Sequence, residues 1–235
     1  MSSRAARRAA ASRRSPVGLV VGIVLLVVGI AVLGWFGYQY IGTTIVSQQS
    51  YGRTATQLEQ QWSTSGPTGS SGTTASATSG DVRPDGTVTR IPGGAVGIMR
   101  VPAFGGSWAV PILDGTDEDV LARGLGWYEQ TAGPGQVGNF AVAGHVVTHG
   151  QPFRRLRSLQ PGATIEVETR DATYTYVVDS SATVKDTDTW VLQPVPGHPG
   201  AQPTDKLITL TTCADLFRSP DRYIVFGHLV STRLK

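Results

Sequence analysis

Cys213 is the only cysteine in this chain of 235 residues, and it stands at the end of a predicted strand. The run before it, Lys-Leu-Ile-Thr-Leu-Thr-Thr at 206–212, is rich in β-branched and apolar residues, which predicts a buried strand ending at the thiol. A second predicted strand begins just after Arg222. If the two strands pair, the guanidinium of Arg222 returns close to the sulfur, where a cation favours thiolate over thiol. The pattern indicates a nucleophile with an anion-stabilising partner. Its alternative is a small buried hydrophobe.

Four histidines are candidates for the acid and base that such a nucleophile needs. His145 follows a predicted strand at 139–143, so it stands where a side chain can project into a cleft. His149 lies four residues later and would suggest a metal pair on a helix, but the flanking glycines and the Val-Val pair between them argue against a helix. We therefore expect no metal site. His198 lies in a proline-rich loop and is expected to be solvated, and His228 lies inside the last predicted strand as a structural residue.

Together these residues resemble the sortase family, the cysteine transpeptidases of Gram-positive cell surfaces. The motifs are Phe-Ala-Val-Ala-Gly-His at 140–145, Thr-Leu-Thr-Thr-Cys at 209–213 and the strand-initial Arg222, in the family's order of His, Cys and Arg. The segments Gly-Gly-Ala-Val-Gly-Ile-Met-Arg-Val-Pro at 93–102 and Gly-Asn-Phe-Ala-Val-Ala-Gly-His at 138–145 look most like the class E branch. The Ala-Asp pair after the cysteine replaces the His-Pro of some members, which weakens the subclass and not the family.

The resemblance implies that Cys213 attacks a peptide carbonyl to form a thioester, and that His145 protonates the leaving amine and later deprotonates the incoming one. Arg222 would stabilise the oxyanion or the bound peptide; its alternative is a surface cation opposite Asp215 or Asp221. The implied substrate is a secreted protein with a C-terminal Leu-x-x-Thr-Gly sorting signal, cut between Thr and Gly. The implied acceptor is an amine of a peptidoglycan precursor, and no cofactor is implied.

Class E members are associated with Leu-Ala-x-Thr-Gly in place of Leu-Pro-x-Thr-Gly. A tyrosine in the family has been linked to that preference, and Tyr128 is the best positional match, although Trp127 departs from the usual preceding residue. Tyr128 and Thr212 are the expected substrate-binding residues. For Tyr128 the alternative is a structural role at the end of the barrel.

Other functions remain open at this point. Pilin-polymerising sortases usually carry an Asp-Pro-aromatic plug, and none occurs between residues 80 and 145, which favours anchoring of proteins to the wall. The L,D-transpeptidases place their cysteine after Ser-His-Gly, whereas here it follows Thr-Thr. The alternative without catalysis is a membrane-tethered β-barrel binding module with an inert thiol.

The N-terminus predicts a membrane anchor. Five arginines in the first fourteen residues precede a span at 17–37 without a charged side chain, long enough to cross a bilayer core of about 30 Å. This arginine bias predicts a cytoplasmic tail at 1–16, a signal anchor at 17–41 and an extracellular remainder. The alternative interpretation is a cleaved signal peptide, but the apolar core of a signal peptide would be shorter than the span at 17–37.

The charge of the exported part excludes one class of partner. Beyond the five N-terminal arginines it holds fifteen basic and seventeen acidic side chains, so a basic nucleic-acid-binding surface is not indicated. Residues 42–81 are interpreted as a juxtamembrane and linker segment. Its first part, 43–61, is compatible with a short helix near the membrane, and a tether of Ser, Thr, Gly and Ala with one Pro follows at 63–80.

Residues 82–235 form the predicted catalytic domain. Seven β-branched runs punctuated by turn residues predict an all-β fold, which by the resemblance is a closed barrel of seven or eight strands. One short helix is expected at 117–123 with Thr116 as N-cap, and another at 151–159. The predicted strands are 95–101, 108–113, 139–143, 164–169, 173–185, 206–212 and 223–231.

Overall fold

The computed structural model describes residues 16–38, 43–64, 94–213 and 220–235. The chain divides into two units, Met1–Ile41 and Gly42–Lys235. The first contains α1 (Pro16–Gly37), whose segment Val17–Gly37 has 21 residues and a mean hydropathy of 3.0. By length and composition this helix is able to cross a membrane. The prediction of one apolar helix near the N-terminus is confirmed.

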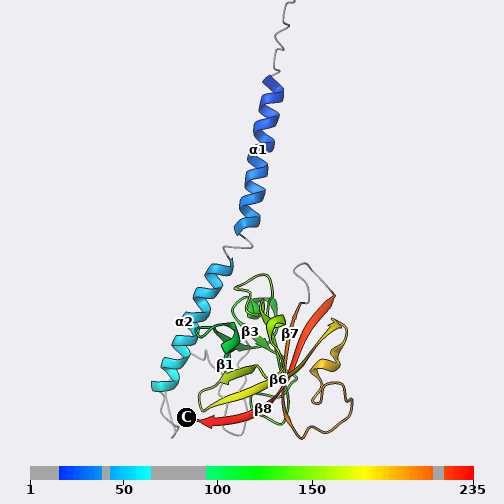
Figure 1. Cartoon of the computed structure of the whole chain (residues 1–235). Coiled ribbons are helices and arrows are strands. Elements are labelled where there is room, and N and C mark those ends of the chain that lie inside the picture. The colour runs from blue at the N-terminus through cyan, green and yellow to red at the C-terminus, as the bar shows by residue number, and fades with distance from the viewer. Residues whose placement is uncertain (1–15, 39–42, 65–93, 214–219) are drawn as a thin grey trace, which may run out of the picture. The chain divides into compact units, whose positions relative to one another are not determined.

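Eight strands of the second unit close into a barrel (Figure 1). Around the barrel their order is β1-β2-β3-β4-β7-β8-β6-β5. The β2–β3 and β4–β7 pairs are parallel, and the other neighbours are antiparallel. The predicted all-β barrel is therefore confirmed, with eight strands. Their bounds are β1 Ala95–Arg100, β2 Ala109–Asp114, β3 Leu125–Trp127, β4 Gly138–Ala143, β5 Thr164–Glu168, β6 Ala172–Lys185, β7 Lys206–Cys213 and β8 Asp221–Leu234.

The parallel pair of β4 and β7 forms the buried part of the barrel wall. All six residues of β4 are buried, as expected for a parallel strand covered on both faces. Phe140 and Val142 belong to the barrel core, while the side-chain amide of Asn139 donates to the carbonyls of Val191 at 3.0 Å and Gln193 at 3.1 Å. These carbonyls lie in and beside the short 3-10 helix η4 (Thr189–Leu192). The connection between β6 and β7 thus covers β4.

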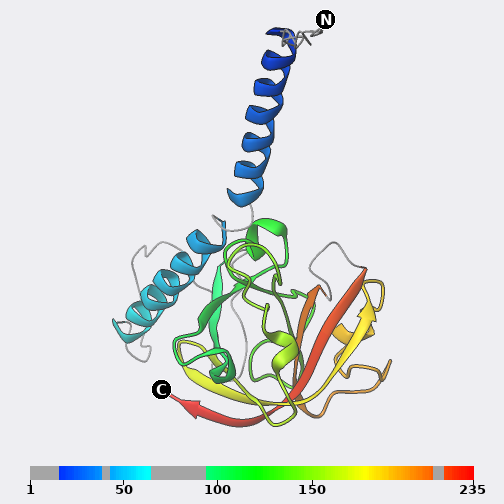
Figure 2. The same cartoon turned by 45° about the horizontal axis from the view of Figure 1, so that its top comes forward.

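The two longest strands, β6 and β8, have 14 residues each and pair along their whole length. They run side by side around the barrel (Figure 2). In the first half of β6 buried residues recur at alternate positions, and the second half is largely exposed. The buried positions of the first half include Tyr174 and Tyr176, two of the largest fully buried side chains.

Three local predictions differ from the structure. Strand β3 was not predicted, because three residues are too few to show an alternating pattern. The first helix exists as α3 (Glu118–Leu121), but Asp117, not Thr116, is its N-cap residue. The predicted helix at 151–159 is wrong: apart from turns, only a 3-10 helix, η3 (Leu156–Ser158), occurs there. Phe153, Leu156 and Leu159 all pack into the core, so tertiary packing decides the path of this segment.

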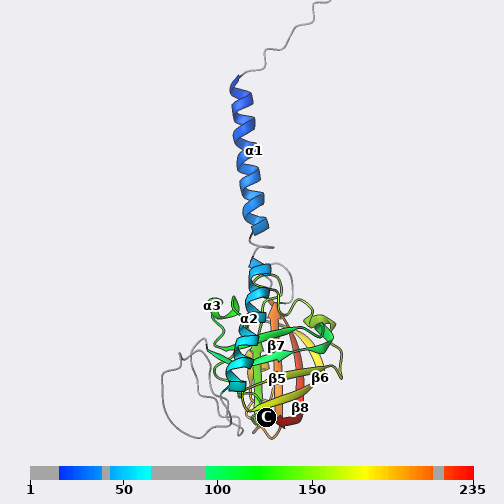
Figure 3. The ribbon, with the colours of Figure 1, turned by 90° about the vertical axis from the view of Figure 1, so that its left-hand side faces the viewer.

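Helix α2 (Thr43–Thr64) is the largest difference from the expected organisation. It has 22 residues and lies against the outside of the barrel (Figures 1 and 3). One stripe of the helix is buried, formed by Tyr51, Ala55, Leu58 and Trp62. The last three pack with Ala95, Ile98, Leu113 and Val120. The sequence interpretation placed this segment outside the folded unit. Residues 65–80 of the predicted tether lie outside the described residues.

Candidate active site

The parallel register of β4 and β7 brings His145 and Cys213 to the same end of the barrel. Ala143 is the partner of Thr211 in this register. His145 and Cys213 each follow two residues later along two strands that run in the same direction. Two residues that are far apart in the sequence therefore come to neighbouring positions because of strand pairing.

Two hydrogen bonds continue this pairing beyond the last ladder residue of β4. The amide of Gly144 donates to the carbonyl of Thr211 at 3.1 Å. In return, the hydroxyl of Thr212 donates to the carbonyl of Gly144 at 2.7 Å. The residues directly before His145 and directly before Cys213 are thus bonded to one another, which fixes the separation of the two backbones.

Arg222 lies on the other side of Cys213. In the antiparallel pairing of β7 and β8, Cys213 and Arg222 are direct partners. Neighbouring strands lie about 4.8 Å apart, so the backbone of His145, two residues beyond the end of β4, lies in one row with Cys213 of β7 and Arg222 of β8. The structure describes Cys213 by its backbone only, and Asp215 belongs to residues 214–219, which lie outside the described part of the chain.

His145 has the properties of a proton-transfer group. Its Nε2 is buried and has no hydrogen-bond partner among the described residues. Burial lowers the pKa of its imidazole, the charge on His149 lowers this pKa further, and Glu118 opposes the shift. The rings of His145 and His149 are 5.2 Å apart at an angle of 34°. The neutral imidazole is therefore favoured, and it can accept a proton from a nearby thiol or amine.

Arg222 contacts Asp186 and Asp221. Its Nη2 lies 3.7 Å from a carboxylate oxygen of Asp186, and its Nη1 donates to the carbonyl of Asp221 at 3.2 Å. The first distance exceeds that of a good hydrogen bond, so this contact is a screened ion pair. The carboxylate of Asp221 accepts instead from Lys185 at 2.5 Å. A half-buried guanidinium with five donors at this position can approach a bound carbonyl or oxyanion.

The two expected substrate-binding residues occupy different environments. Tyr128 directly follows β3 and is partly exposed; its amide donates to the carbonyl of Ala141 at 3.0 Å, so its backbone lies beside the middle of β4. Its hydroxyl shares a 3.0 Å hydrogen bond with the hydroxyl of Thr211. Thr212 is only 4% exposed, and its hydroxyl is engaged by Gly144 as described above. Tyr128 is thus partly accessible to solvent, whereas Thr212 lies inside the barrel wall.

The remaining two histidines lie away from this row. His228 pairs with Leu207 near the start of β7, at the opposite end of that strand from Cys213. It is exposed, and its Nδ1 lies 2.7 Å from a carboxylate oxygen of Asp179. His198 is also exposed, in the connection between β6 and β7. Within the described ranges, no group of three or more His, Cys, Asp or Glu residues could hold a metal ion.

Comparison with known proteins identifies the family. A model of the sortase domain matches residues 99–230 of this chain. The chain belongs to the sortase family. It is 32% identical over 240 residues to Sortase SrtE1 of Streptomyces coelicolor, covering 97% of this chain and 62% of that protein. The chain therefore spans less than two thirds of the length of this relative.

Solved structures of sortases share the barrel. Sortase E from Streptomyces avermitilis has 39% sequence identity and a TM-score of 0.56, covering 61% of this chain and 93% of its own. The SrtA sortase from Actinomyces oris has 40% identity and a TM-score of 0.59, covering 61% of this chain and 84% of its own. The similarity to class E sortases that the motifs suggested is therefore confirmed.

The sequence interpretation of this sortase missed two groups of residues near the site. His149 was considered only as a metal ligand, and that role was rejected. Its position beside the ring of His145 was not predicted. Tyr51 and Gln48 of α2 reach the loop after His145, as described below. A signal for α2 was present: residues 51, 55, 58 and 62 repeat at helical spacing, which is typical of a packed amphipathic helix.

Proposed function

We propose that this sortase is a cysteine transpeptidase with His145, Cys213 and Arg222 as its catalytic residues. The observation that supports the proposal is the row formed by His145, just beyond β4, Cys213 at the end of β7 and Arg222 in β8. The three residue types supply a nucleophile, a proton carrier and a permanent cation, which are the groups that acyl transfer requires.

The properties of His145 support the following order of proton transfers. The neutral imidazole accepts the proton of the Cys213 thiol, and the thiolate attacks the scissile carbonyl. Arg222 stabilises the negative charge that develops on the carbonyl oxygen. The imidazolium then gives its proton to the leaving amine as the carbon–nitrogen bond breaks, which leaves a thioester on Cys213. In the second half, neutral His145 accepts a proton from the incoming amine, and the thiol is restored when the new amide forms.

The substrate we propose is a secreted protein with a C-terminal Leu-x-x-Thr-Gly-like signal, cleaved between Thr and Gly, and the acceptor is an amine of a cell-wall precursor. The similarity to class E sortases supports a preference for Ala at the second position of the signal. Tyr128 is the residue we assign to this preference. A hydroxyl has one donor and two acceptor sites, so Tyr128 can donate to Thr211 and still accept from a peptide amide.

We further propose that α1 anchors the protein in the membrane with its N-terminus in the cytoplasm. The basis is the arginine bias before the apolar helix. Protease added to intact cells should then remove the catalytic domain and leave the arginine-rich end protected. Recovery of the mature protein free in the medium, starting near residue 45, would reject the anchor.

Mass spectrometry of the protein incubated with Leu-Ala-x-Thr-Gly and Leu-Pro-x-Thr-Gly peptides tests the reaction. We expect a covalent acyl adduct on Cys213 and exchange of the Gly-containing fragment for an added amine. Cys213→Ala should form no adduct, and His145→Ala and Arg222→Ala should each lose transpeptidation with the fold intact. His198→Ala, a change to an exposed histidine remote from the row, is the matched control and should retain activity.

Two results would reject the assignment. If native Cys213 forms no adduct and resists thiol reagents, the domain is a binding module with an inert thiol. If His145→Ala is active, the proton carrier is another residue. Non-additive losses among the three variants are expected, because residues that act as one unit cannot be removed independently.

A further inference from the structure

The loop that carries His145 has an unusual backbone. Three consecutive residues adopt left-handed conformations: His149 at φ 50°, Gly150 at φ 75° and Gln151 at φ 52°. Non-glycine residues persist in this region only where the surrounding structure holds them. Residues 144–151, which we call the His145 loop, therefore depend on contacts from outside the loop.

Helix α2 supplies contacts at the left-handed residues themselves. The hydroxyl of Tyr51 donates to the carbonyl of His149, and the side-chain amide of Gln48 donates to the carbonyl of Gly150 at 3.2 Å. Tyr51 is 3% exposed, and burial raises the pKa of its phenol, so the hydroxyl stays protonated and can donate. A Cβ atom on Gly150 would lie 2.5 Å from the ring of Tyr51. The tyrosine ring and the loop backbone therefore fit together without spare room.

The same loop sets the surroundings of the catalytic imidazole. The carbonyl of His145 accepts from the amide of Phe153 at 3.0 Å, which ties the start of the loop to its end. The ring of His149 lies 5.2 Å from that of His145 and is one cause of its lowered pKa. A change in the backbone at His149 would therefore change both the position and the proton affinity of His145.

The C-terminal part of α2 packs on the barrel and not on the His145 loop. Ala55, Leu58 and Trp62 pack on the outer face of the barrel with residues of β1, β2 and α3. None of these three belongs to the part of the helix that meets the His145 loop. The helix therefore has one segment that contacts the loop and one that covers the barrel, and the two can be tested separately.

We propose that α2 is part of the active-site framework, with Tyr51 as a positioning residue that holds the His145 loop, and through it the imidazole, in the arrangement used for proton transfer. The proposal rests on the proposed function for the role of His145. Residues 38–42 alone separate α1 from α2 in the chain, so the positioning helix directly follows the apolar helix. A fragment limited to residues 82–235 would lack this positioning residue.

The experiment compares Tyr51→Phe with wild type in the full chain, solubilised in detergent. This change removes one hydroxyl and keeps the ring. We expect kcat for a sorting-signal peptide to fall about tenfold with KM unchanged, the effect of losing one hydrogen bond that positions a reacting group. We also expect the titration midpoint of His145, followed by NMR of labelled histidine, to move toward its ordinary value as the loop opens to water.

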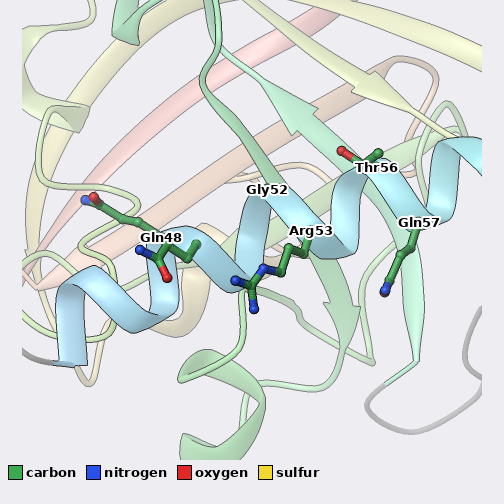
Figure 4. Close-up of a pocket in the computed structure, with 6 residues that line it drawn as sticks. Gln48, Gly52, Arg53, Thr56 and Gln57 are labelled. Carbon is green, nitrogen blue, oxygen red and sulfur yellow. The ribbon is translucent and has the colours of Figure 1, made fainter.

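Two control variants on the same helix separate positioning from stability. Gln57→Ala changes a residue of the same type as Gln48. Both line a surface hollow of about 470 Å³ on α2, and their side chains are labelled in Figure 4. Gln57 makes no described hydrogen bond to the His145 loop. It should leave kcat and the His145 titration unchanged. Leu58→Ala should lower the melting temperature by removing a buried side chain, without changing kcat of the folded protein or the His145 titration.

An unchanged kcat and an unchanged His145 titration in Tyr51→Phe would overturn the proposal. So would a fall in kcat without a shift in the titration, because that result would show a general structural effect. If the wild-type protein proved to have no transpeptidase activity, the proposed function would fail while the NMR titration still decided whether Tyr51 sets the state of His145.

Discussion

Removal of the hydrogen bond between Thr212 and Gly144 tests whether this bond stabilises the pairing of the two strand ends beside His145 and Cys213. The variant Thr212→Val keeps the shape of the side chain and removes only its hydroxyl. In the wild type this hydroxyl donates to the Gly144 carbonyl at 2.7 Å from a residue that is 4% exposed. Loss of the donor removes a bond to a carbonyl in the barrel wall, at a cost of about 1 to 3 kcal/mol. For a unit the size of Gly42–Lys235 this corresponds to a fall in melting temperature of about 2 to 12 °C.

Thermal unfolding of the detergent-solubilised full chain measures this effect. Thr164→Val is the matched control, since Thr164 is an exposed residue in β5 with no described side-chain hydrogen bond. We expect a change in melting temperature near zero for the control and a clear fall for Thr212→Val. We also expect lower transpeptidase activity from Thr212→Val at a temperature where it is folded, because Gly144 directly precedes His145. Equal melting temperatures for the two variants would refute the reasoning, since the bond would then contribute no net stability.

Two further predictions concern specificity and pH. Tyr128→Phe should slow the Leu-Ala-x-Thr-Gly peptide more than the Leu-Pro-x-Thr-Gly peptide, because proline has no amide hydrogen for the tyrosine oxygen to accept; the ratio of the two kcat/KM values should narrow by about tenfold or more. Equal slowing would show that Tyr128 is structural, and a wild-type preference for proline would contradict the class E substrate. Because the pKa of His145 is lowered in the folded protein, the unfolded chain binds a proton there more readily, and the stability linked to this residue is lost as the pH falls through the ordinary value toward the lowered one. Denaturant titrations at about pH 7.5 and about pH 5.5 should therefore show a smaller acid loss for His145→Gln than for wild type, with His198→Gln as the control; identical losses in all three proteins would contradict the assigned shift.

Much of the candidate site could be predicted from local sequence. A thiol at the end of a β-branched run, a histidine at the end of another and an arginine at the start of a third were each visible in short stretches of the chain. The distances among them could not be predicted in this way. They depend on the register of β4 with β7 and of β7 with β8, and the sequence of one strand does not specify which residue of another strand it will face.

Where the local sequence pattern is weak, contacts with neighbouring elements determine the conformation of the segment. Strand β3 has three residues and exists because β2 and β4 flank it on either side. The segment 151–159 has a helix-compatible composition, yet the left-handed backbone at Gln151 and the burial of Phe153 and Leu156 favour turns instead. In both cases the contacts that fix the conformation come from residues distant in the sequence.

The sequence by itself determined the apolar N-terminal helix, the all-β class and the one thiol that is the candidate nucleophile. Each follows from composition or from a period of two residues along the chain, and these properties are local. Only the tertiary structure decided that α2 packs on the barrel and that Tyr51 meets the loop after His145. Helical spacing can show that a helix has an apolar face, but the partner of that face is set by the shape of the surface it covers. In this protein the surface forms only when eight strands close, and the loop that carries His145 lies at one end of it.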